Sequence, residues 1–439
     1  MRRWIAAGLV LAVMLAACGT ASPGARQITP TPAASLRGLT NADDLVTSAP
    51  EGTPTPVPAA DQFTVRVWWP DEIYPADDDP SQPILTGQFD DFTQTYSRYT
   101  LQVRRKRANG LGGILPTLRT AQPIAPGALP DLTLMRRSDM VTAATEGLIV
   151  PIDTWIPPDI LESLLPGVAE IGEIDGTLYG LPYLLTLYHM AYRESVYPDP
   201  PTTFEAVLAQ TPTYLFPGNV TGQGTGANLT LLLQYWAAGG QLVDADGLPA
   251  LNRDPLLAVY SYYEQGVALG IFGPDLMAFS QTSEYWDQFE TGAASLAFVN
   301  SSTYLRRRAS VPNTAPSTIP TLTGTAITTP ESWMWVLTTS DPDRQNQARA
   351  FLSWMMRVSQ QSAFSESYGY LPTAQRALQL WDDQSYASFA QSLLANMVQV
   401  PVTQRSNSAA AALQAGFAAV LDGTPAETAA DEALQLLAN

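Results

Sequence analysis

The sequence predicts an α/β protein built as two lobes, and three observations support this fold class. Short strand-like runs alternate with longer stretches of helical spacing, which is the order that parallel α/β sheets require. The part expected to fold is roughly 380 of the 439 residues, which is long for one hydrophobic core. An apolar leader and a proline-rich segment precede it and are expected to stay outside the fold.

The first residues predict export and a lipid anchor. Arg2 and Arg3 precede an uninterrupted apolar run over residues 5–17, which is shorter than the roughly 20 residues of a membrane span and has the length of a signal-peptide core. The run ends in Leu-Ala-Ala-Cys-Gly, where Cys18 is the only cysteine of the chain. Residues 1–18 therefore resemble a bacterial lipoprotein signal, in which the cysteine becomes the lipidated N-terminus. An ordinary signal peptide with an incidental cysteine is the alternative.

Residues 19–60 predict a disordered tether. They are rich in proline, threonine, serine and alanine, as in Thr-Pro-Thr-Pro-Val-Pro-Ala-Ala over residues 53–60. Such a segment cannot bury enough apolar surface to offset the entropy lost on ordering. About 40 residues of flexible coil span roughly 35 Å, so a folded domain on this tether can leave and meet a partner in the membrane.

Charge and residue content exclude several classes of function. The chain has 23 basic and 41 acidic residues and a net charge of −18, so we expect neither nucleic acid nor an anionic lipid surface as a partner. His189 is the only histidine, and it lies in an apolar run that predicts a buried structural role. Zinc motifs and the G-x-S-x-G nucleophile elbow are absent from the sequence.

We therefore expect a protein without cofactor, metal or enzyme activity. The acidic residues between Asp71 and Asp79 lack the spacing of a calcium loop and predict a solvated surface instead. A carboxylate pair suited to glycoside hydrolysis remains an open alternative, because the separation of two carboxylates is a property of the fold and not of the sequence.

The expected elements follow one another regularly. Residues 63–69 alternate and are β-branched, which predicts the first strand, ended by Pro70; residues 101–104 and 130–135 predict two more strands. Helical spacing appears at 84–96 and from Ser138 onward, before a turn at 147–153. The later helices are expected over residues 204–209, 229–238, 255–269, 344–361, 386–399, 409–421 and 426–437.

Eight short segments carry a resemblance to a known family, and they occur in the family's order. They are FDDF at 89–92, LPDLT at 129–133, GLIVPID at 147–153, DGTLYGLPY at 175–183, PTTFE at 201–205, AAGGQLVD at 237–244, FETGAASLAF at 289–298 and GYLPT at 369–373. From residue 63 to its C-terminus the chain resembles the extracellular solute-binding proteins of sugar-type ABC importers, of which the maltose-binding protein is the best known. The segments are turns, strand starts and packing positions, so they specify the fold better than the ligand.

The resemblance implies a two-lobed periplasmic-binding-protein fold (type II-like) with chain crossings between the lobes and the ligand in the cleft. By position, the N-terminal lobe would be residues 61–180 plus 320–351, and the C-terminal lobe residues 181–319 plus 352–439. Two departures from the family pattern distinguish this chain at positions that bear on the ligand. Arg193 and Glu194 stand where the family has asparagine and lysine, and Ser-Trp-Met-Trp at 332–335 replaces a glycine-serine segment.

A sugar offers hydroxyl groups and an apolar face, so its site needs aromatic rings together with amide, carboxylate or guanidinium groups. Alternation places Trp68 and Trp69 on opposite faces of the first strand, and we expect Trp69 at the cleft. Tyr183 and Trp333 are expected to contact the ligand, and the alternative for both is packing in the core. Arg136 and Arg137 follow the third strand, where a ligand contact is expected; the alternative is an arginine pair on the surface. With the resemblance, the predicted ligand site is Trp69, Arg137, Ser138, Tyr183, Thr186, Asn300, Thr303, Trp333, Arg405 and Asn407.

The sequence thus predicts a monomeric, extracytoplasmic lipoprotein that captures an uncharged sugar or oligosaccharide and hands it to an ABC permease. Its expected place is the periplasmic or cell-surface side of the membrane that holds the lipid anchor. Two other functions remain open: an extracytoplasmic carbohydrate-active enzyme, and a ligand-sensing lipoprotein that signals to a membrane kinase.

Overall fold

A computed structural model describes residues 62–220, 225–400 and 403–438. The predicted signal peptide, Cys18 and the predicted tether at 19–60 lie outside the described residues. Within the described part, no helix is long and apolar enough to cross a bilayer.

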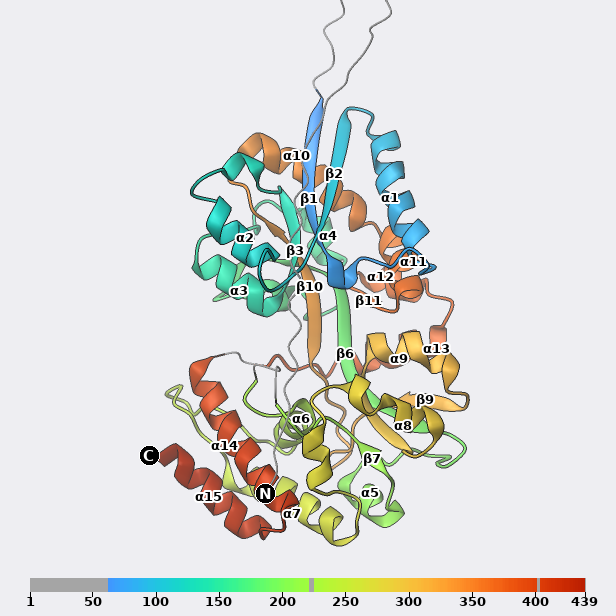
Figure 1. Ribbon diagram of the computed structural model, residues 1–439, viewed down its shortest axis with the longest axis vertical. Helices are drawn as coiled ribbons and strands as arrows, with labels where there is room; N and C mark the ends of the chain where they lie inside the picture. Colours follow the sequence, from blue (N-terminus) through green and yellow to red (C-terminus); the bar gives the residue numbers. More distant parts are fainter. Residues whose placement is uncertain (1–61, 221–224, 401–402, 439) are drawn as a thin grey trace, which may run out of the picture. The chain divides into compact units, whose positions relative to one another are not determined.

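The first lobe is built on three strands whose carboxyl ends face the middle of the molecule (Figure 1). β1 pairs in parallel with β2 and with β3, so helices must return the chain between them. Pro70 is the last residue of β1, and the expected strands and helices of this region form with small shifts of their ends. The elements are β1 (Phe63–Pro70), α1 (Gln82–Thr95), β2 (Tyr99–Lys106), α2 (Ile114–Ala121), β3 (Leu132–Arg136), α3 (Arg137–Thr145), α4 (Pro158–Glu162), β4 (Glu173–Ile174) and β5 (Thr177–Leu178).

Two long antiparallel strands connect the lobes. β6 (Leu181–Arg193) and β10 (Pro330–Leu337) pair from Leu181 to Leu187, and both continue the first-lobe sheet in the order β2-β1-β3-β10-β6. The second half of β6 leaves this sheet and pairs with β8 and β9 in the second lobe. β6 is buried along almost its whole length, which fits its continuous apolar sequence and its place between two layers.

The second lobe surrounds the far half of β6 (Figure 1). β8 pairs with β6 on one side and in parallel with β7 on the other. β11, from the C-terminal part of the chain, pairs with the first half of β6. The elements of this lobe are α5 (Phe204–Gln210), β7 (Tyr214–Leu215), α6 (Leu229–Ala237), α7 (Arg253–Ala268), α8 (Trp286–Thr291), β8 (Leu296–Asn300), α9 (Ser301–Arg307), β9 (Thr314–Ser317), α13 (Gln384–Leu394), α14 (Gln404–Leu421) and α15 (Ala426–Ala438). Between β10 and α13 the chain forms α10 (Pro342–Met355), α11 (Val358–Tyr368), β11 (Leu371–Pro372) and α12 (Gln375–Gln379), which lie beside the first-lobe sheet (Figure 1).

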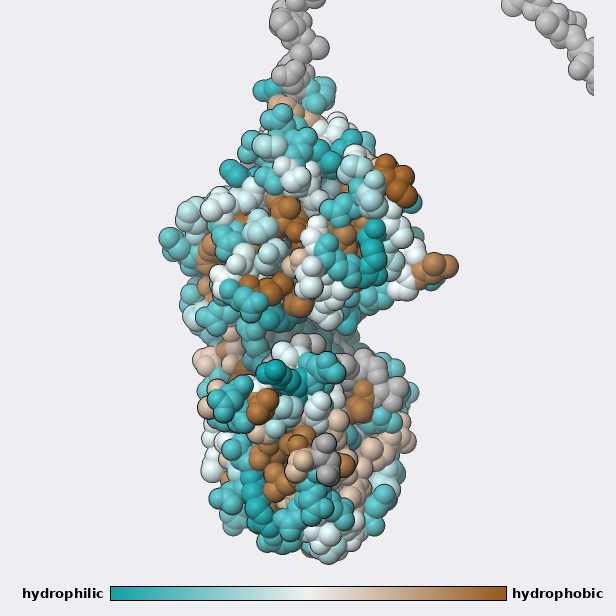
Figure 2. Space-filling view, turned by 90° about the vertical axis from the view of Figure 1, so that its left-hand side faces the viewer, coloured by the Kyte–Doolittle hydropathy of each residue, from teal (hydrophilic) through white to brown (hydrophobic). Residues whose placement is uncertain are grey.

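Two hydrophobic clusters hold these elements together. One fills one face of the first-lobe sheet and contains Trp69 and Trp335. The other covers the opposite face, where Trp68 lies, and continues along the crossing strands into the second lobe. Trp68 and Trp69 therefore point to opposite faces, as strand alternation requires. Figure 2 shows the narrowing of the surface between the two lobes.

The region after β10 differs from the prediction. A single helix was expected over residues 344–361, but the structure has α10 and α11 with a break at Met356 and Arg357, because Arg357 adopts an extended backbone at the start of α11. Both helices pack on the first lobe, where Leu352, Trp354 and Phe364 join the cluster of Trp69. The lobe boundary expected after Phe351 falls inside α10.

Candidate functional site

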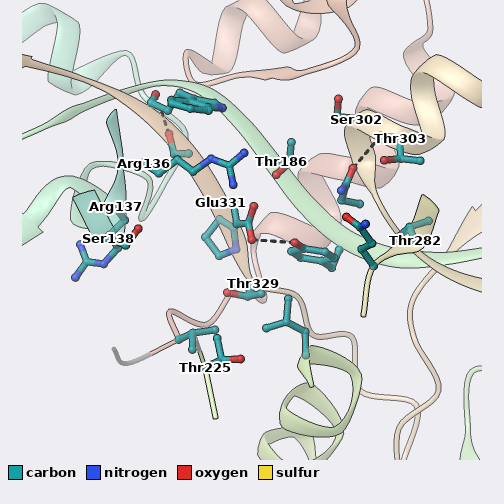
Figure 3. Close-up of a pocket in the computed structure, with 18 of the residues that line it drawn as sticks. Arg136, Arg137, Ser138, Thr186, Thr225, Thr282, Ser302, Thr303, Thr329 and Glu331 are labelled. Carbon is teal, nitrogen blue, oxygen red and sulfur yellow. Dashed lines mark hydrogen bonds between the residues drawn. The ribbon is translucent and has the colours of Figure 1, made fainter. Parts of the chain in front are cut away.

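A cleft of about 780 Å³ lies where the two lobes and the crossing strands meet. The first lobe contributes the end of β3 and the start of α3, and the second lobe contributes the end of β8 and the start of α9. Strand ends gather at this place because open α/β sheets leave a crevice beyond the carboxyl ends of their strands. Figure 3 shows side chains from both lobes and from β6 and β10 around this space.

On the first-lobe side, two neighbouring arginines line the cleft in different ways. Arg137 is partly buried, and its Nη1 donates to the carbonyl oxygens of Ile171 and Glu173 at 2.5 and 3.0 Å. Burial lowers the pKa of the Arg137 guanidinium. Arg136 is exposed, and its guanidinium carbon lies 4.9 Å from the ring centroid of Trp333. Arg137 is thus fixed by the backbone, whereas Arg136 presents its donors to the cleft.

The floor of the cleft is formed by the crossing strands. The Tyr188 hydroxyl donates to Glu331 at 2.8 Å, and the Tyr188 ring stacks on Phe298 with centroids 5.3 Å apart and an interplanar angle of 9°. Burial raises the pKa of Tyr188 well above its ordinary value, and the Glu331 carboxylate raises it further. Tyr188 therefore remains a neutral phenol at physiological pH, with a ring that an apolar ligand face can contact.

On the second-lobe side, the cleft is lined by small polar groups. Asn300 ends β8, and its side-chain oxygen accepts from the Thr303 backbone N–H at 2.8 Å, which caps the start of α9. This bond leaves the amide N–H groups of Asn300 as donors. Ser302, Thr303 and Thr282 also line the cleft, and they add hydroxyl groups without adding charge.

The chemistry of the lining suits a polar, hydroxyl-bearing ligand. Hydroxyl and amide groups alternate with the rings of Tyr188, Trp333 and Tyr370, and Glu331 is the only carboxylate among the described lining residues. In the described part of the chain, no cluster of three or more His, Cys, Asp or Glu side chains is arranged to hold a metal ion. The acidic loop between β1 and α1 has partners in the protein, since Asp71 pairs with Arg105 and Asp79 with Arg306.

A family model described as bacterial extracellular solute-binding protein matches residues 87–391. The chain belongs to this family. Among curated proteins, this solute-binding protein is 31% identical over 102 residues to a maltotriose-binding protein of Pyrococcus abyssi. That match covers 23% of this chain and 22% of the relative, so the chain spans about a fifth of the length of the curated relative that it matches.

Solved structures of sugar-binding proteins share the two-lobed fold of this solute-binding protein. The cyclic α-maltosyl-1,6-maltose binding protein of Arthrobacter globiformis superposes with a TM-score of 0.67 at 19% identity, over 86% of this chain and 98% of that chain. The sugar-binding protein MalE of Xanthomonas citri gives a TM-score of 0.66 at 18% identity, over 86% and 98% of the two chains. At these identities the likeness shows the fold class that the sequence predicts.

The cleft brings together six of the ten predicted ligand residues. They come from the end of β3, from both crossing strands and from the turn into α9: Arg137, Ser138, Thr186, Asn300, Thr303 and Trp333. Trp333 is only 4% exposed, and Arg136 lies over one face of its ring. Trp333 thus supports Arg136 at the wall of the cleft and does not offer that face to a ligand.

Two predicted residues lie in the core instead. Trp69 is fully buried, its indole Nε1 donates to the Ile73 carbonyl at 2.9 Å, and its ring packs edge-on against Tyr183 and Trp335. Tyr183 is also fully buried. Trp69 was placed by alternation and Tyr183 by its position after the Leu-Pro segment, and neither argument shows that both faces of the sheet are covered at this point.

Arg405 and Asn407 lie in the first turn of α14, which begins at Gln404. Neither is among the described lining residues of the cleft. The exposed Arg405 donates from Nη1 to the Gly247 carbonyl at 3.1 Å, on the surface of the second lobe. The helix starts five residues earlier than expected, so this segment is helical and does not reach the cleft as a loop.

Sequence reasoning missed Tyr188, Glu331 and Tyr370. Tyr188 was hidden within the apolar run of β6, where His189 is fully buried as expected. Glu331 directly precedes the Ser-Trp-Met-Trp segment, of which only the aromatic residues were considered. Tyr370 lies in the GYLPT segment and was treated as part of a packing motif.

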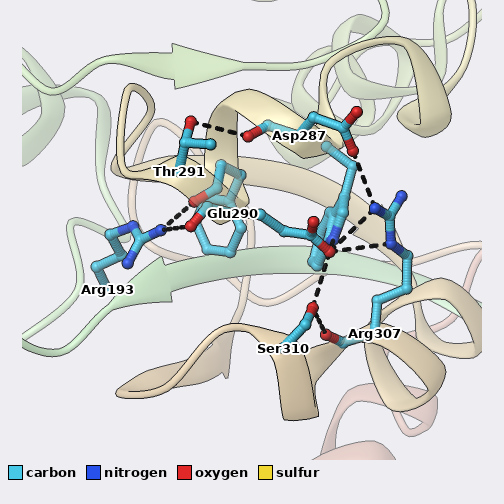
Figure 4. Close-up of polar contacts among 8 residues, drawn as sticks. Arg193, Asp287, Glu290, Thr291, Arg307 and Ser310 are labelled. Carbon is cyan, nitrogen blue, oxygen red and sulfur yellow. Dashed lines mark hydrogen bonds and ion pairs between the residues drawn. The ribbon is translucent and has the colours of Figure 1, made fainter.

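Arg193, one of the two departures from the family pattern, is not among the described residues that line the cleft. Arg193 ends β6 and donates to the carbonyl oxygens of Phe289 and Glu290 at the end of α8 (Figure 4). The Glu290 carboxylate in turn accepts from Arg307 and Ser310. A cation at the carboxyl end of a helix is favourable, so Arg193 stabilises the end of α8, while Arg307 connects the acidic side chains of α8 to α9.

Proposed function

We propose that this solute-binding protein captures a sugar or oligosaccharide in the cleft and delivers it to an ABC permease without altering it. The observation that carries the proposal is the cleft itself, which joins hydroxyl, amide and guanidinium groups with aromatic rings from two lobes. Structural neighbours named for maltose, maltotetraose and mannotriose support a carbohydrate as the ligand.

The charge of the lining supports binding over hydrolysis. Glycoside hydrolases of the common kind need two carboxyl groups about 5–10 Å apart across the scissile bond. Glu331 is the only carboxylate among the described lining residues, and it accepts a hydrogen bond from Tyr188. The described lining therefore offers one carboxylate where that chemistry needs two.

The lobes are proposed to move against each other about the crossing strands. β6 pairs with strands of both lobes, and β10 runs beside it at the cleft floor; hinge closure around a ligand is the usual motion of two-lobed binding proteins. The lipid anchor at Cys18 and the tether at 19–60 are part of the same proposal, since they would hold the domain near its permease.

Isothermal titration calorimetry of the purified full chain tests this function. We expect saturable binding to at least one sugar or oligosaccharide from a panel of mono- to tetrasaccharides, polyols and glycerophosphodiesters. Chromatography of the ligand after long incubation should return it unchanged. Binding to another ligand class, with no binding to any carbohydrate of the panel, would overturn the sugar assignment. Release of a product from the ligand would overturn the non-catalytic assignment.

A further inference from the structure

Among the described residues that line the cleft, Arg136 is the arginine whose hydrogen-bonding groups are left for a ligand. Within residues 62–220, 225–400 and 403–438, its guanidinium makes no ion pair and no hydrogen bond, whereas Arg137 donates to two carbonyl oxygens. A guanidinium carries five N–H donors in a planar fork that matches a carboxylate or a phosphate. Arg136 lines the cleft with this fork exposed.

The protein holds Arg136 in position without a direct ion pair among the described residues, although the charge of the nearby Asp139 acts on it. The guanidinium lies over the Trp333 ring at 4.9 Å from the centroid, and Arg136 and Trp333 are direct partners in the β3–β10 pairing. The charge of Arg136 reaches both tyrosines of the cleft. Burial raises the pKa of Tyr188 and of Tyr370, and the positive charge of Arg136 lowers both. A stacked arginine keeps its charge and loses little entropy when it binds a ligand.

The edge of the first lobe beside the cleft is basic, in contrast to the rest of the chain. The whole chain has a net charge of −18. Yet β2 ends in consecutive basic residues, Arg104, Arg105 and Lys106, followed by Arg107, and Asn109 just beyond them lines the cleft. Parallel pairing places the ends of β2, β1 and β3 at the same edge.

Two acidic groups of this edge are already engaged, and a third, the half-buried Asp139 in the first turn of α3, lies near enough to interact with the Arg136 charge. Asp71 pairs with Arg105 at 3.2 Å, and Glu72 accepts from the Ala108 backbone N–H at 3.1 Å. Glu331 carries the single negative charge of the described lining, against the two positive charges of Arg136 and Arg137. The described lining therefore has a net positive charge in an acidic protein, with Asp139 nearby but outside the lining, and a low-dielectric cleft concentrates the field of its lining on the ligand.

We propose that the ligand is a carbohydrate bearing one anionic group, a carboxylate or a phosphate, and that Arg136 binds this group. The proposal rests on the carbohydrate-binding function proposed above and narrows the ligand from sugars in general to acidic sugars. Glu331 then serves the neutral part of the ligand, where its carboxylate accepts from hydroxyl groups, and it repels an anion that enters in the wrong orientation.

Calorimetry with matched sugars tests the proposal on the full chain. The probes are glucose with glucuronate and glucose 6-phosphate, and galactobiose with digalacturonate; acetate and inorganic phosphate report the anion alone. We expect one anionic sugar to bind about 10- to 100-fold more tightly than its neutral counterpart, the range that hydrogen bonds to a charged group provide. The uronate and phosphate arms distinguish the two sources of the charge.

Variants separate the role of Arg136 from a general effect of charge. Arg136→Gln should reduce the preference for the anionic sugar to about threefold or less, while binding of the neutral sugar changes little. Glu331→Gln should increase the preference for the anionic sugar, because it removes the single negative charge of the described lining. Arg253→Gln, on α7 in an exposed ion pair with Glu427, is the matched control and should leave the preference unchanged.

Equal affinity for the neutral and anionic members of each pair would overturn the proposal and leave the carbohydrate function standing. An anionic preference that survives in Arg136→Gln would also overturn it. If no carbohydrate, neutral or acidic, bound in calorimetry, the result would contradict both the carbohydrate function and the proposal of an acidic ligand.

Discussion

The Tyr188 hydroxyl donates to the Glu331 carboxylate at 2.8 Å and so joins the two crossing strands at the floor of the cleft. Tyr188 lies on β6 where this strand passes from the first lobe to the second, and Glu331 lies near the start of β10. Any motion of the lobes about these strands acts on this contact, which places a ligand-facing ring and a carboxylate at the proposed hinge.

Loss of the Tyr188 ring is expected to weaken ligand binding. Tyr188→Ala removes both the stacking surface and the hydroxyl, so we expect the dissociation constant to rise about 10- to 100-fold. Tyr188→Phe keeps the ring on Phe298 and removes one hydrogen bond, for which we expect a rise of about fivefold. Calorimetry with the best ligand measures both; equal affinity of wild type and Tyr188→Ala would remove Tyr188 from the site.

Trp333 and Trp69 form a contrasting pair. Trp333→Ala removes the platform under Arg136, so we expect affinity to fall by roughly 1–3 kcal/mol. Trp69 is fully buried, and Trp69→Ala should destabilise the fold by about 3–5 kcal/mol in urea unfolding. The folded fraction of that variant should bind with wild-type affinity. A selective loss of affinity in Trp69→Ala would return this residue to the cleft.

An ion pair connects the lobes beside the cleft. Arg306 at the end of α9 donates to Asp79 at 3.3 Å and lies 5.0 Å from the ring centroid of Tyr368, which belongs to the first-lobe cluster. Asp79→Asn should weaken this contact and favour other lobe arrangements, including a closed one. We therefore expect a rise in apparent affinity of about two- to fivefold, smaller at high salt. Unchanged or weaker binding would show that the pair does not restrain closure.

Buried His189 predicts a loss of stability in mild acid. Burial lowers the pKa of His189 to about 4 in the folded state, below its ordinary value of 6.5, so the unfolded state binds the proton more tightly. The contribution of neutral His189 to the free energy of unfolding is fully present above pH 6.5. It is lost as the pH falls toward 4, and the total loss is about 3 kcal/mol. Urea unfolding should show this fall.

His189→Gln is the control for that fall, because glutamine has no titrating ring. His189 is the only histidine of the chain, so the difference between the two proteins isolates its titration from that of the carboxylates. Identical slopes between pH 6.5 and 5 in wild type and variant would contradict the prediction.

The lipid anchor is tested by Cys18→Ser. We expect the full chain to sediment with membranes and to require detergent for release, and the variant to appear in the soluble fraction. Mass spectrometry of the mature N-terminus should find a diacylated cysteine. Membrane retention of the serine variant would point to another means of attachment.

The fold could be predicted further than the site. Strand alternation placed Trp68 and Trp69 on opposite faces, and the order of strands and helices indicated α/β lobes. Alternation does not say which face is core, because that depends on elements far away in the sequence: α10 and α11, some 280 residues later, cover the Trp69 face. The end of β3 was recognisable as a ligand position, since strand ends converge in α/β sheets.

The cleft floor was beyond prediction for a different reason. In the sequence, Tyr188 cannot be distinguished from the apolar core residues of β6. Only the pairing of β6 with β8 and β10 brings it beside Glu331, which is 143 residues away. The break between α10 and α11 was hidden by the continuous helical spacing across Met356 and Arg357. Long-range pairing and backbone breaks of this kind leave little local signal.

The central claim is that the two lobes close on a carbohydrate, and a distance between them measures this most directly. In a Cys18→Ser background, spin labels at Leu111→Cys in the first lobe and Leu248→Cys in the second use two exposed positions. Double electron–electron resonance should show a shorter distance at saturating ligand than without it, with the ligand recovered intact. Saturated binding with an unchanged distance would contradict the account.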